Sequence, residues 1–528
     1  MTTMAPLRIG IVGVGPKGLF ALDALESMLR EGAGTPFDLH LFEPHHAPGA
    51  GPVYDPGQAD HLRMNFHSES IGIREASESF CSWARCTHPR WADPAAYAPR
   101  ALVGEYLHAC FKSRTERLSG RARIQLHPWI VTGAQFAGGS WTVQGESEEV
   151  VVDELLIATG HASRRSLNRP PPHPALIPSV YPVSQRLSLC SVPAGSTVAI
   201  RGFGLTSMDA ILTLLGRIDG TRPRHIVPYS RSGRPMVPKA DPGSRGAATS
   251  PPSAFWEEGR ARVAGSSTVV GMEEILVTTA ADAWCSRTDP AGSHSDPEGP
   301  VRRHLQWLLQ NSVGRVGGET PREALGRGLA VARGTAHWDP ERALGETWRG
   351  LYPGFVEAVG NGRIAIGERP RFRRLCHEME RISFGPPAFV VERMIEGVDE
   401  GIVDLTFLDD PRVEFGDGVH LVGAGGECTA DRLIDAVLDP PGATPGSSSL
   451  LRELLRDGYL CIEPGTEGVS VARDGSAIGR DGERTPGLAV IGRPTEGSVL
   501  GNDTLSRTLH RHPTEWAERV GRRIMCTG

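Results

Sequence analysis

The sequence predicts an α/β protein with two Rossmann-like dinucleotide-binding domains and a helical insertion. Two strand–helix–strand patterns predict this fold, one at the N-terminus and one beginning near residue 198, and each carries a glycine-rich turn. The third observation is the composition: 64 of the 528 residues are glycine, about 12% against a usual level near 7%. We therefore expect many glycines in loops and at close backbone contacts.

The first strand–helix–strand unit begins with the apolar run 7–14, which reads as a buried parallel strand. A helix follows over 16–31, with Pro16 in its first turn, where the missing N–H of proline costs nothing. A second strand follows over 37–43. This order of elements within a short segment is typical of a βαβ unit.

A G-x-G-x-x-G pattern at Gly13, Gly15 and Gly18 fills the turn between the first strand and its helix. The first glycine permits the tight turn, the second lets the backbone approach a pyrophosphate, and the third allows close packing of helix on strand. Glu43 ends the second strand, where a carboxylate accepts hydrogen bonds from ribose hydroxyls. In this context the pattern predicts a dinucleotide site.

A proline-rich joint over 170–182 separates this unit from a second one, with a strand over 198–203, a helix over 205–218 and a strand over 224–231. Its turn reads G-x-G-x-x-S, so a serine replaces the packing glycine. The second predicted dinucleotide site therefore comprises Gly202, Gly204, Leu205, Thr206 and Ser207.

The strand that follows the second turn carries no acidic residue at its end. Arg231 lies there instead, and Arg234 follows. A carboxylate would repel a 2′-phosphate, whereas arginine binds one, so these residues favour NADPH over NADH. The alternative is that both are ordinary surface arginines.

Three further segments are expected to border the cofactors. The loop 49–68 follows the ribose-binding strand and contains Tyr54 and Asn65. Strands ending in glycine are expected near 157–160, 421–426 and 489–497. The candidate residues on the first and last of these strands and just beyond are Thr159, Gly160, Gly492, Asn502 and Asp503. Loop packing, or capping of a final helix over 503–524 by Asp503 or Thr504, is the alternative explanation.

Net charge, cysteine content and the absence of long apolar runs limit the kinds of partner and the cellular compartment that we expect. The net charge of −6 argues against a broad basic surface for nucleic acid. Nine dispersed cysteines without a C-x-x-C pair are typical of reduced thiols in a cytoplasmic protein. No apolar run approaches the roughly 18 residues of a membrane span, and no metal-ligand spacing is present. Lysine is rare, since Lys17, Lys112 and Lys239 are the only lysines.

Together these motifs resemble the bacterial FAD/NAD(P)-binding proteins with two Rossmann units, which are related to flavin-dependent N-hydroxylating monooxygenases. The segments that carry the resemblance are GVGPKG (13–18), GAGPVYDP (49–56), LRMNFHS (62–68), GFGLTSMD (202–209), YSRSGRP (229–235), GSRG (243–246) and RISFGPP (381–387). The resemblance implies FAD on the first unit and NADPH on the second. With FAD in place, Asn65 is the candidate catalytic residue beside the isoalloxazine ring.

The same resemblance implies a reaction. NADPH reduces the flavin, molecular oxygen adds at C4a, and the resulting hydroperoxyflavin hydroxylates the nitrogen of a small amino acid or amine. A flavin dehydrogenase or reductase without oxygen transfer is the first alternative, and a non-catalytic FAD/NAD(P)-binding protein is the second. Arg63, Arg74 and Arg100 could hold a substrate carboxylate. Large flavoproteins of this kind often form homo-oligomers.

The expected domain organisation follows the order of these motifs. We expect loops over 240–300, short strands over 389–392 and 402–407, and four consecutive parts. These are the first part of the FAD-binding domain (1–190), the NADPH-binding domain (191–300), a helical insertion on the substrate side (301–385), and returning FAD-domain strands with a C-terminal helix (386–528).

Overall fold

The apolar run near the N-terminus forms β1 (Arg8–Val12), the central strand of the first sheet. It pairs in parallel with β2 (Phe37–Phe42) on one side and with β7 (Glu154–Ile157) on the other. Burial on both faces explains the almost uninterrupted hydrophobic sequence of these strands. The computed structural model describes residues 5–30, 35–73, 78–160, 170–240, 251, 253–288, 296–311, 313–314, 316–438, 442–443, 448–502 and 504–526.

The first sheet has the order β15-β16-β7-β1-β2-β3, and only β15 runs antiparallel to its neighbour. Helices α1 and α14 pack against each other beside it, and α3 lies against α1. A small antiparallel sheet, β4-β5-β6, precedes β7. The bounds are α1 (Pro16–Arg30), α2 (Phe80–Thr87), α3 (Arg100–Leu118), β3 (Ala122–His127), β4 (Gly133–Ala137), β5 (Ser140–Gln144), β6 (Glu149–Val152), α13 (Ser449–Asp457), β15 (Ser476–Ile478), β16 (Arg484–Val490) and α14 (His512–Cys526).

The second sheet is parallel and has the order β10-β9-β14-β8. An antiparallel sheet, β11-β12-β13, lies beside it and shares its core. Helices α5 and α12 pack together on this domain. The bounds are β8 (Leu176–Ile177), α4 (Val183–Arg186), β9 (Thr197–Arg201), α5 (Leu205–Leu215), β10 (His225–Tyr229), α12 (Ala388–Asp399), β11 (Arg412–Phe415), β12 (Val419–Gly423), β13 (Gly426–Ala430) and β14 (Arg432–Asp435).

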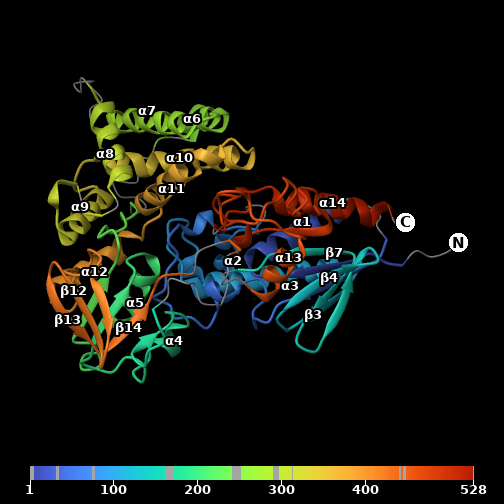
Figure 1. Cartoon of the computed structure of the whole chain (residues 1–528), viewed down its shortest axis with the longest axis horizontal. Coiled ribbons are helices and arrows are strands. Elements are labelled where there is room, and N and C mark those ends of the chain that lie inside the picture. Colours follow the sequence, from blue (N-terminus) through green and yellow to red (C-terminus); the bar gives the residue numbers. More distant parts are fainter. Residues whose placement is uncertain are drawn as a thin grey trace.

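In Figure 1 a third part, made of helices, stands above the second domain, and one end of α10 extends toward the first domain. Its core gathers around Trp348 and Phe355 of α10. Thr320 and Glu323 form a capping box at the start of α9, and Asp339 caps α10. The bounds are α6 (Ser253–Gly265), α7 (Val269–Thr288), α8 (Glu298–Gln310), α9 (Pro321–Arg333), α10 (Pro340–Gly360) and α11 (Arg369–Ser383).

Short 3₁₀ turns complete the described backbone, at Pro52–Tyr54, Ser68–Ser70, Pro89–Trp91, Val316–Gly318, Ile366–Glu368 and Arg493–Thr495. Across the described parts of the chain, no helix is both long enough and apolar enough to cross a bilayer.

Several expected elements are wrong. The stretch expected as loops contains α6 and α7. The strand expected over 389–392 is part of α12, because Pro387 caps a helix whose apolar residues then face the second domain. Residues 402–407 run alongside β10 with a single bridge at Val403 rather than as a strand. The final helix begins at His512 and not near residue 503.

The domain boundaries shift accordingly. β8 already belongs to the second sheet, so that domain begins in the proline-rich joint and not at residue 191. The helical part begins at α6 rather than at residue 301. β11–β14 return to the second domain, since β14 pairs with β9, and only the chain from α13 onward returns to the first. The glycines of 421–426 therefore form a hairpin of the second domain rather than a cofactor edge.

A buried ion pair joins the two Rossmann domains. Arg100, at the start of α3, donates from its guanidinium to both carboxylate oxygens of Asp209 in α5, one of them at 3.3 Å. The Tyr181 hydroxyl donates to the same carboxylate. Arg100 also donates to the carbonyl of Arg63 at 3.0 Å. Burial opposes the charge of Arg100, but Asp209 overrides this and raises the pKa of the guanidinium.

We predict that Arg100→Met lowers the free energy of unfolding by about 3–5 kcal/mol, because it leaves the Asp209 carboxylate buried without its cation. Urea unfolding measures the loss. The control is Arg123→Met, since Arg123 pairs with Asp38 at an exposed site and its loss should cost less than about 1 kcal/mol. Equal effects of the two variants would contradict the assignment of Arg100 as the joint between domains.

Candidate functional site

The first glycine-rich turn has the steric requirements that its sequence predicted. Gly13 has a φ of +86°, and a Cβ there would lie 2.8 Å from the carbonyl oxygen of Ala158. A Cβ on Gly18 would lie 2.2 Å from the carbonyl oxygen of Gly13, so only glycine lets α1 pack this close to the turn. Both positions are thus needed for the backbone path itself.

Gly15 has a different surrounding. A Cβ on Gly15 would meet only the Cα of Gly51, at 3.9 Å, and Gly51 has a φ of +67°. The loop 49–54 therefore runs directly beside the N-terminus of α1, where free backbone amides favour an anion. The predicted loop and the predicted fingerprint are brought together, and the two glycines keep side chains out of the space between them.

Glu43 lies at the end of β2 and is 7% exposed. Its Oε2 accepts the amide hydrogen of Val14 at 2.7 Å, and its Oε1 accepts that of His45 at 3.0 Å. These bonds hold the carboxylate against the glycine-rich turn. Each oxygen retains a second lone pair, so ribose hydroxyls remain possible donors.

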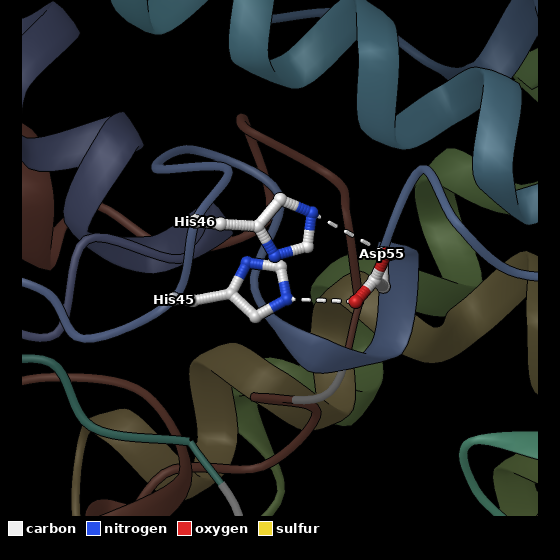
Figure 2. Close-up of side chains that lie close together, drawn as sticks. All are labelled: His45, His46 and Asp55. Atoms are coloured by element: carbon white, nitrogen blue, oxygen red, sulfur yellow. Dashed lines mark hydrogen bonds and ion pairs between the residues drawn. The ribbon is translucent and has the colours of Figure 1, made fainter. Parts of the chain in front are cut away.

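Figure 2 shows a cluster of His45, His46 and Asp55. It is linked to Glu43 through the amide of His45, which donates to that carboxylate. His45 Nε2 lies 3.0 Å from one carboxylate oxygen of Asp55, and His46 Nε2 lies 3.7 Å from the other. The amide of Ala47 donates to His45 Nδ1 at 3.2 Å, and the carbonyl of Ala47 lies 3.4 Å from the same nitrogen. The contact of His45 with Asp55 ties the loop that contains Asp55 to the end of β2.

The second glycine-rich turn repeats the arrangement on β9 and α5. Gly202 has a φ of +103°, and its amide donates to the carbonyl of Tyr229 at 2.8 Å. Gly204 is the N-cap of α5, and a Cβ there would meet nothing within 4 Å. Leu205 and Thr206 form the first turn of that helix, and Ser207 is fully buried where the first unit has Gly18.

The structure separates the two arginines proposed for a 2′-phosphate. Arg231 is exposed directly after β10. Arg234 is 4% exposed, pairs with Glu378 of α11 at 3.0 Å, and donates to the carbonyls of Gly314 and Asn311. Arg234 thus joins the second domain to the helical part, and Arg231 remains the candidate for phosphate.

The returning strands bring further candidates to the first turn. Thr159 and Gly160 follow β7 beside Gly13, and Gly492 follows β16 with a φ of +79°. A small cavity is lined by Gly492, Asn502 and Lys17, among others. The side chain of Asn502 donates to Thr495 Oγ1 at 2.8 Å, so it closes its own loop. Asp503 lies outside the described residues, as do Arg74 and the segment 243–246.

Asn65 lies where the three parts of the molecule meet. Its Nδ2 donates to the carbonyl of Phe384, after α11, at 3.3 Å, and its own carbonyl accepts from Lys239 Nζ. Tyr54 is half-buried. Its backbone carbonyl packs against Gly104 of α3, and a Cβ on Gly104 would lie 1.6 Å from the carbonyl oxygen of Tyr54. Contact of either residue with a cofactor stays a prediction.

Sequence reasoning missed the charged residues of α10. Arg342, Glu346 and Arg349 recur at a helical spacing and face Lys239. Two sequence features could have drawn attention to these residues, namely the rarity of lysine and the spacing of opposite charges by four residues. Neither feature shows which part of the molecule the helix packs against.

Residues 10–162 match the protein family described as FAD-NAD(P)-binding. An L-aspartate N-monooxygenase (nitrosuccinate-forming) of Streptomyces cremeus is 27% identical over 283 residues, which is 45% of this chain and 42% of that protein. A second L-aspartate N-monooxygenase, from Streptomyces davaonensis, is 29% identical over 44% of this chain and 43% of its own length. The match thus spans less than half of these curated relatives. The predicted resemblance to FAD/NAD(P)-binding proteins and N-hydroxylating monooxygenases is confirmed.

Among solved structures, an ornithine N-hydroxylase from Kutzneria sp. 744 has a similar fold, with a TM-score of 0.54. It is 15% identical, and the alignment covers 98% of this chain and 100% of that one. This likeness confirms the predicted α/β fold with parallel sheets over nearly the whole chain.

The neutral histidines beside Lys17 make a pH-dependent prediction. Burial, and then the charge of Lys17, lower the pKa of His510 to about 3 and that of His512 to about 4. In the unfolded chain each of these histidines has a pKa near 6.5, whereas in the folded chain each stays neutral to a much lower pH. The free energy of unfolding therefore decreases as the pH falls below about 6.5, because the unfolded chain binds protons that the folded chain does not. We expect about 2 kcal/mol of lost stability per ring by pH 5.

Urea unfolding at pH 7.5 and pH 5 measures this loss. His510→Gln should weaken the pH dependence, since the amide can still donate to the Leu500 carbonyl that His510 Nε2 contacts at 2.7 Å. His337→Gln, at an exposed position, is the control. An unchanged pH dependence in His510→Gln would contradict the prediction.

Proposed function

We propose, from the match of residues 10–162 to the FAD-NAD(P)-binding family, that the whole chain is an FAD- and NADPH-dependent N-monooxygenase acting on a small amino-acid-like substrate. The observation that carries the proposal is the pair of glycine-rich turns, each at the N-terminus of a helix and each followed by a parallel strand. The two Streptomyces relatives, named as aspartate N-monooxygenases, support the reaction class.

The first turn fits FAD. The backbone of Gly15 and Gly51 leaves room for a pyrophosphate at the N-terminus of α1, and Glu43 is held in position for a ribose. The loop 49–68 then leads to Asn65, on the side of the helical part. When bound there, FAD would supply oxygen activation with electrons from NADPH.

The second turn fits NADPH. A side chain at Gly204 would project into open space, so packing does not require glycine there, whereas a nearby phosphate would. Arg231 supplies an exposed guanidinium where the 2′-phosphate is expected. Arg100 and Asp209 hold this domain against the first, which is the arrangement that a hydride transfer between two bound cofactors requires.

The chain's own residues have defined tasks in this proposal. Asn65 and Lys239 would border the place where the nitrogen reacts. The aromatic rings of Phe384 and Tyr352, whose centres lie 5.2 Å apart, would shield that place from water. The nine cysteines are all free, and they are dispersed, so a dithiol relay of the disulfide-reductase kind has no support.

The proposal predicts that NADPH oxidation by the FAD-loaded chain depends on oxygen, and that the amine product gains the mass of one oxygen atom. Oxygen uptake and product mass spectrometry measure both. Equal NADPH oxidation with and without oxygen would overturn the monooxygenase proposal. Stoichiometric hydrogen peroxide without a hydroxylated product would favour a flavin reductase instead.

The separation of the two arginines gives a sharper test of the second site. Arg231→Ala should raise the KM for NADPH about 10- to 100-fold and leave the KM for NADH unchanged, because one charge-assisted contact is lost. Arg234→Ala should lower the stability without changing this ratio, since Arg234 is engaged with Glu378. A change in cofactor preference with Arg234→Ala alone would contradict the assignment.

A further inference from the structure

The cluster of His45, His46 and Asp55 brings together the ligand types of a metal site. Figure 2 shows both imidazole rings directed at the same carboxylate, and each ring reaches a different oxygen of it. The three ligand atoms lie within 4.8 Å of one another. Among the residues that the structure describes, no other group of three histidine, cysteine, aspartate or glutamate side chains converges in this way. The cluster therefore differs from an ordinary surface pair of a histidine and an acid.

The distances between the ligand atoms suit a small cation. Zinc binds imidazole nitrogen and carboxylate oxygen at about 2.0–2.2 Å, so two ligand atoms of a tetrahedral site lie about 3.3–3.5 Å apart. The observed separations from the Asp55 carboxylate, 3.0 Å for His45 and 3.7 Å for His46, lie on either side of this range. His46 is exposed, so rotation of its ring can bring the two imidazoles closer together. Three protein ligands leave a fourth position for water.

His45 has a backbone partner in either tautomer. When the amide of Ala47 donates to Nδ1, at 3.2 Å, the ring proton is on Nε2 and is directed at Asp55. When the proton is on Nδ1, the carbonyl of Ala47 can accept it at 3.4 Å. A histidine that ligates a metal usually donates its other ring nitrogen to such an oxygen. The second tautomer thus frees the lone pair of Nε2 for a cation without leaving Nδ1 unpaired.

The backbone also fixes both ends of the cluster. The amide of Gly57 donates to Asp55 Oδ1 at 2.6 Å, which orients this carboxylate. The amide of His45 donates to Glu43 at 3.0 Å, which holds His45 at the end of β2. Contacts of this kind orient the ligands of a metal before the ion binds. The ten positions between His45 and Asp55 match no familiar zinc spacing, and only the turn of the loop brings the two together.

We propose that His45, His46 and Asp55 bind one divalent transition-metal cation of the first row, such as Zn²⁺. Two imidazoles favour such ions over Mg²⁺ and Ca²⁺, which prefer oxygen ligands. The ion would join the loop that contains Asp55 to the end of β2 and so stabilise the first domain. This structural role lies outside the proposed redox reaction and does not depend on it.

Titration of the FAD-loaded full chain with Zn²⁺, after dialysis against a chelator, tests the site. Calorimetry should show one ion bound per chain, and the midpoint of urea unfolding should rise with Zn²⁺. His46→Gln and Asp55→Asn should each weaken binding at least about 100-fold, because losing a ligand costs more than losing an outer contact. His88→Gln is the matched control, since His88 Nε2 lies 3.9 Å from the Glu105 carboxylate but belongs to no group of three ligands within the described residues.

Zinc X-ray absorption on the loaded chain identifies the ligands. Nitrogen from two imidazoles, with oxygen and without sulfur, is expected. Sulfur ligands would overturn the inference, because they would place the ion on exposed cysteines such as Cys86 or Cys190. Equal Zn²⁺ affinity in the native chain and His46→Gln, or no binding at micromolar Zn²⁺, would overturn it as well. Because His46 is exposed, His46→Gln should unfold like the native chain without zinc, so this comparison does not rely on a destabilised variant.

Discussion

The contact of Arg100 with Asp209 is the interaction on which the arrangement of the two Rossmann domains depends. It joins α3 of the first domain to α5, the helix that follows the second glycine-rich turn. Arg100 also fixes the carbonyl of Arg63, two residues before Asn65, so the same guanidinium sets the course of the loop and the position of the other domain. A charge pair this well buried contributes little net stability against an apolar alternative, but it is costly to break and demands one geometry. Because the ion pair permits only one geometry, it fixes the relative position of the two domains more strictly than a purely apolar interface would.

Close backbone contacts explain why glycine was informative at some positions and not at others. At Gly13 and Gly18 a Cβ would collide with backbone atoms, so the fold alone demands glycine. At Gly15 and Gly204 the structure offers space, so the demand must come from something that the polypeptide does not contain. The second kind of glycine is the stronger functional signal. The second unit has a buried Ser207 at the position that corresponds to Gly18, so its turn accommodates a side chain there that the first turn does not.

The sequence allowed the two βαβ units and their turns to be predicted, because strand, turn and helix signals there are local and agree with one another. The helical part was only half recognised. Its α6 and α7 follow a segment of turn-forming residues, and α12 begins with a run of valine and phenylalanine that favours a strand until Pro387 and the partner helix α5 are considered. The return of β14 to the second sheet could not be predicted at all, because strand order depends on contacts more than two hundred residues apart in the chain, such as Ile434 with Ile200. Arg234 shows the same limit for a site residue. An arginine at this position was a reasonable candidate for binding a phosphate, but its burial against Glu378 of α11 depends on a contact between distant segments of the chain.

The charged face of α10 shows the same dependence on tertiary contacts. The helix needs a carboxylate at Glu346 to tolerate Arg342 and Arg349 within one buried stretch, and that requirement is met within the helix itself. Lys239 then arrives from another domain with its ammonium among these arginines and only a backbone carbonyl as its partner. Neutral side chains of similar length would pack there without the cost of burying further charge. Burial, and then the charge of Arg349, lower the pKa of the Lys239 ammonium group to about 7. The position of this lysine is therefore set by contacts between distant segments, which no local sequence pattern shows.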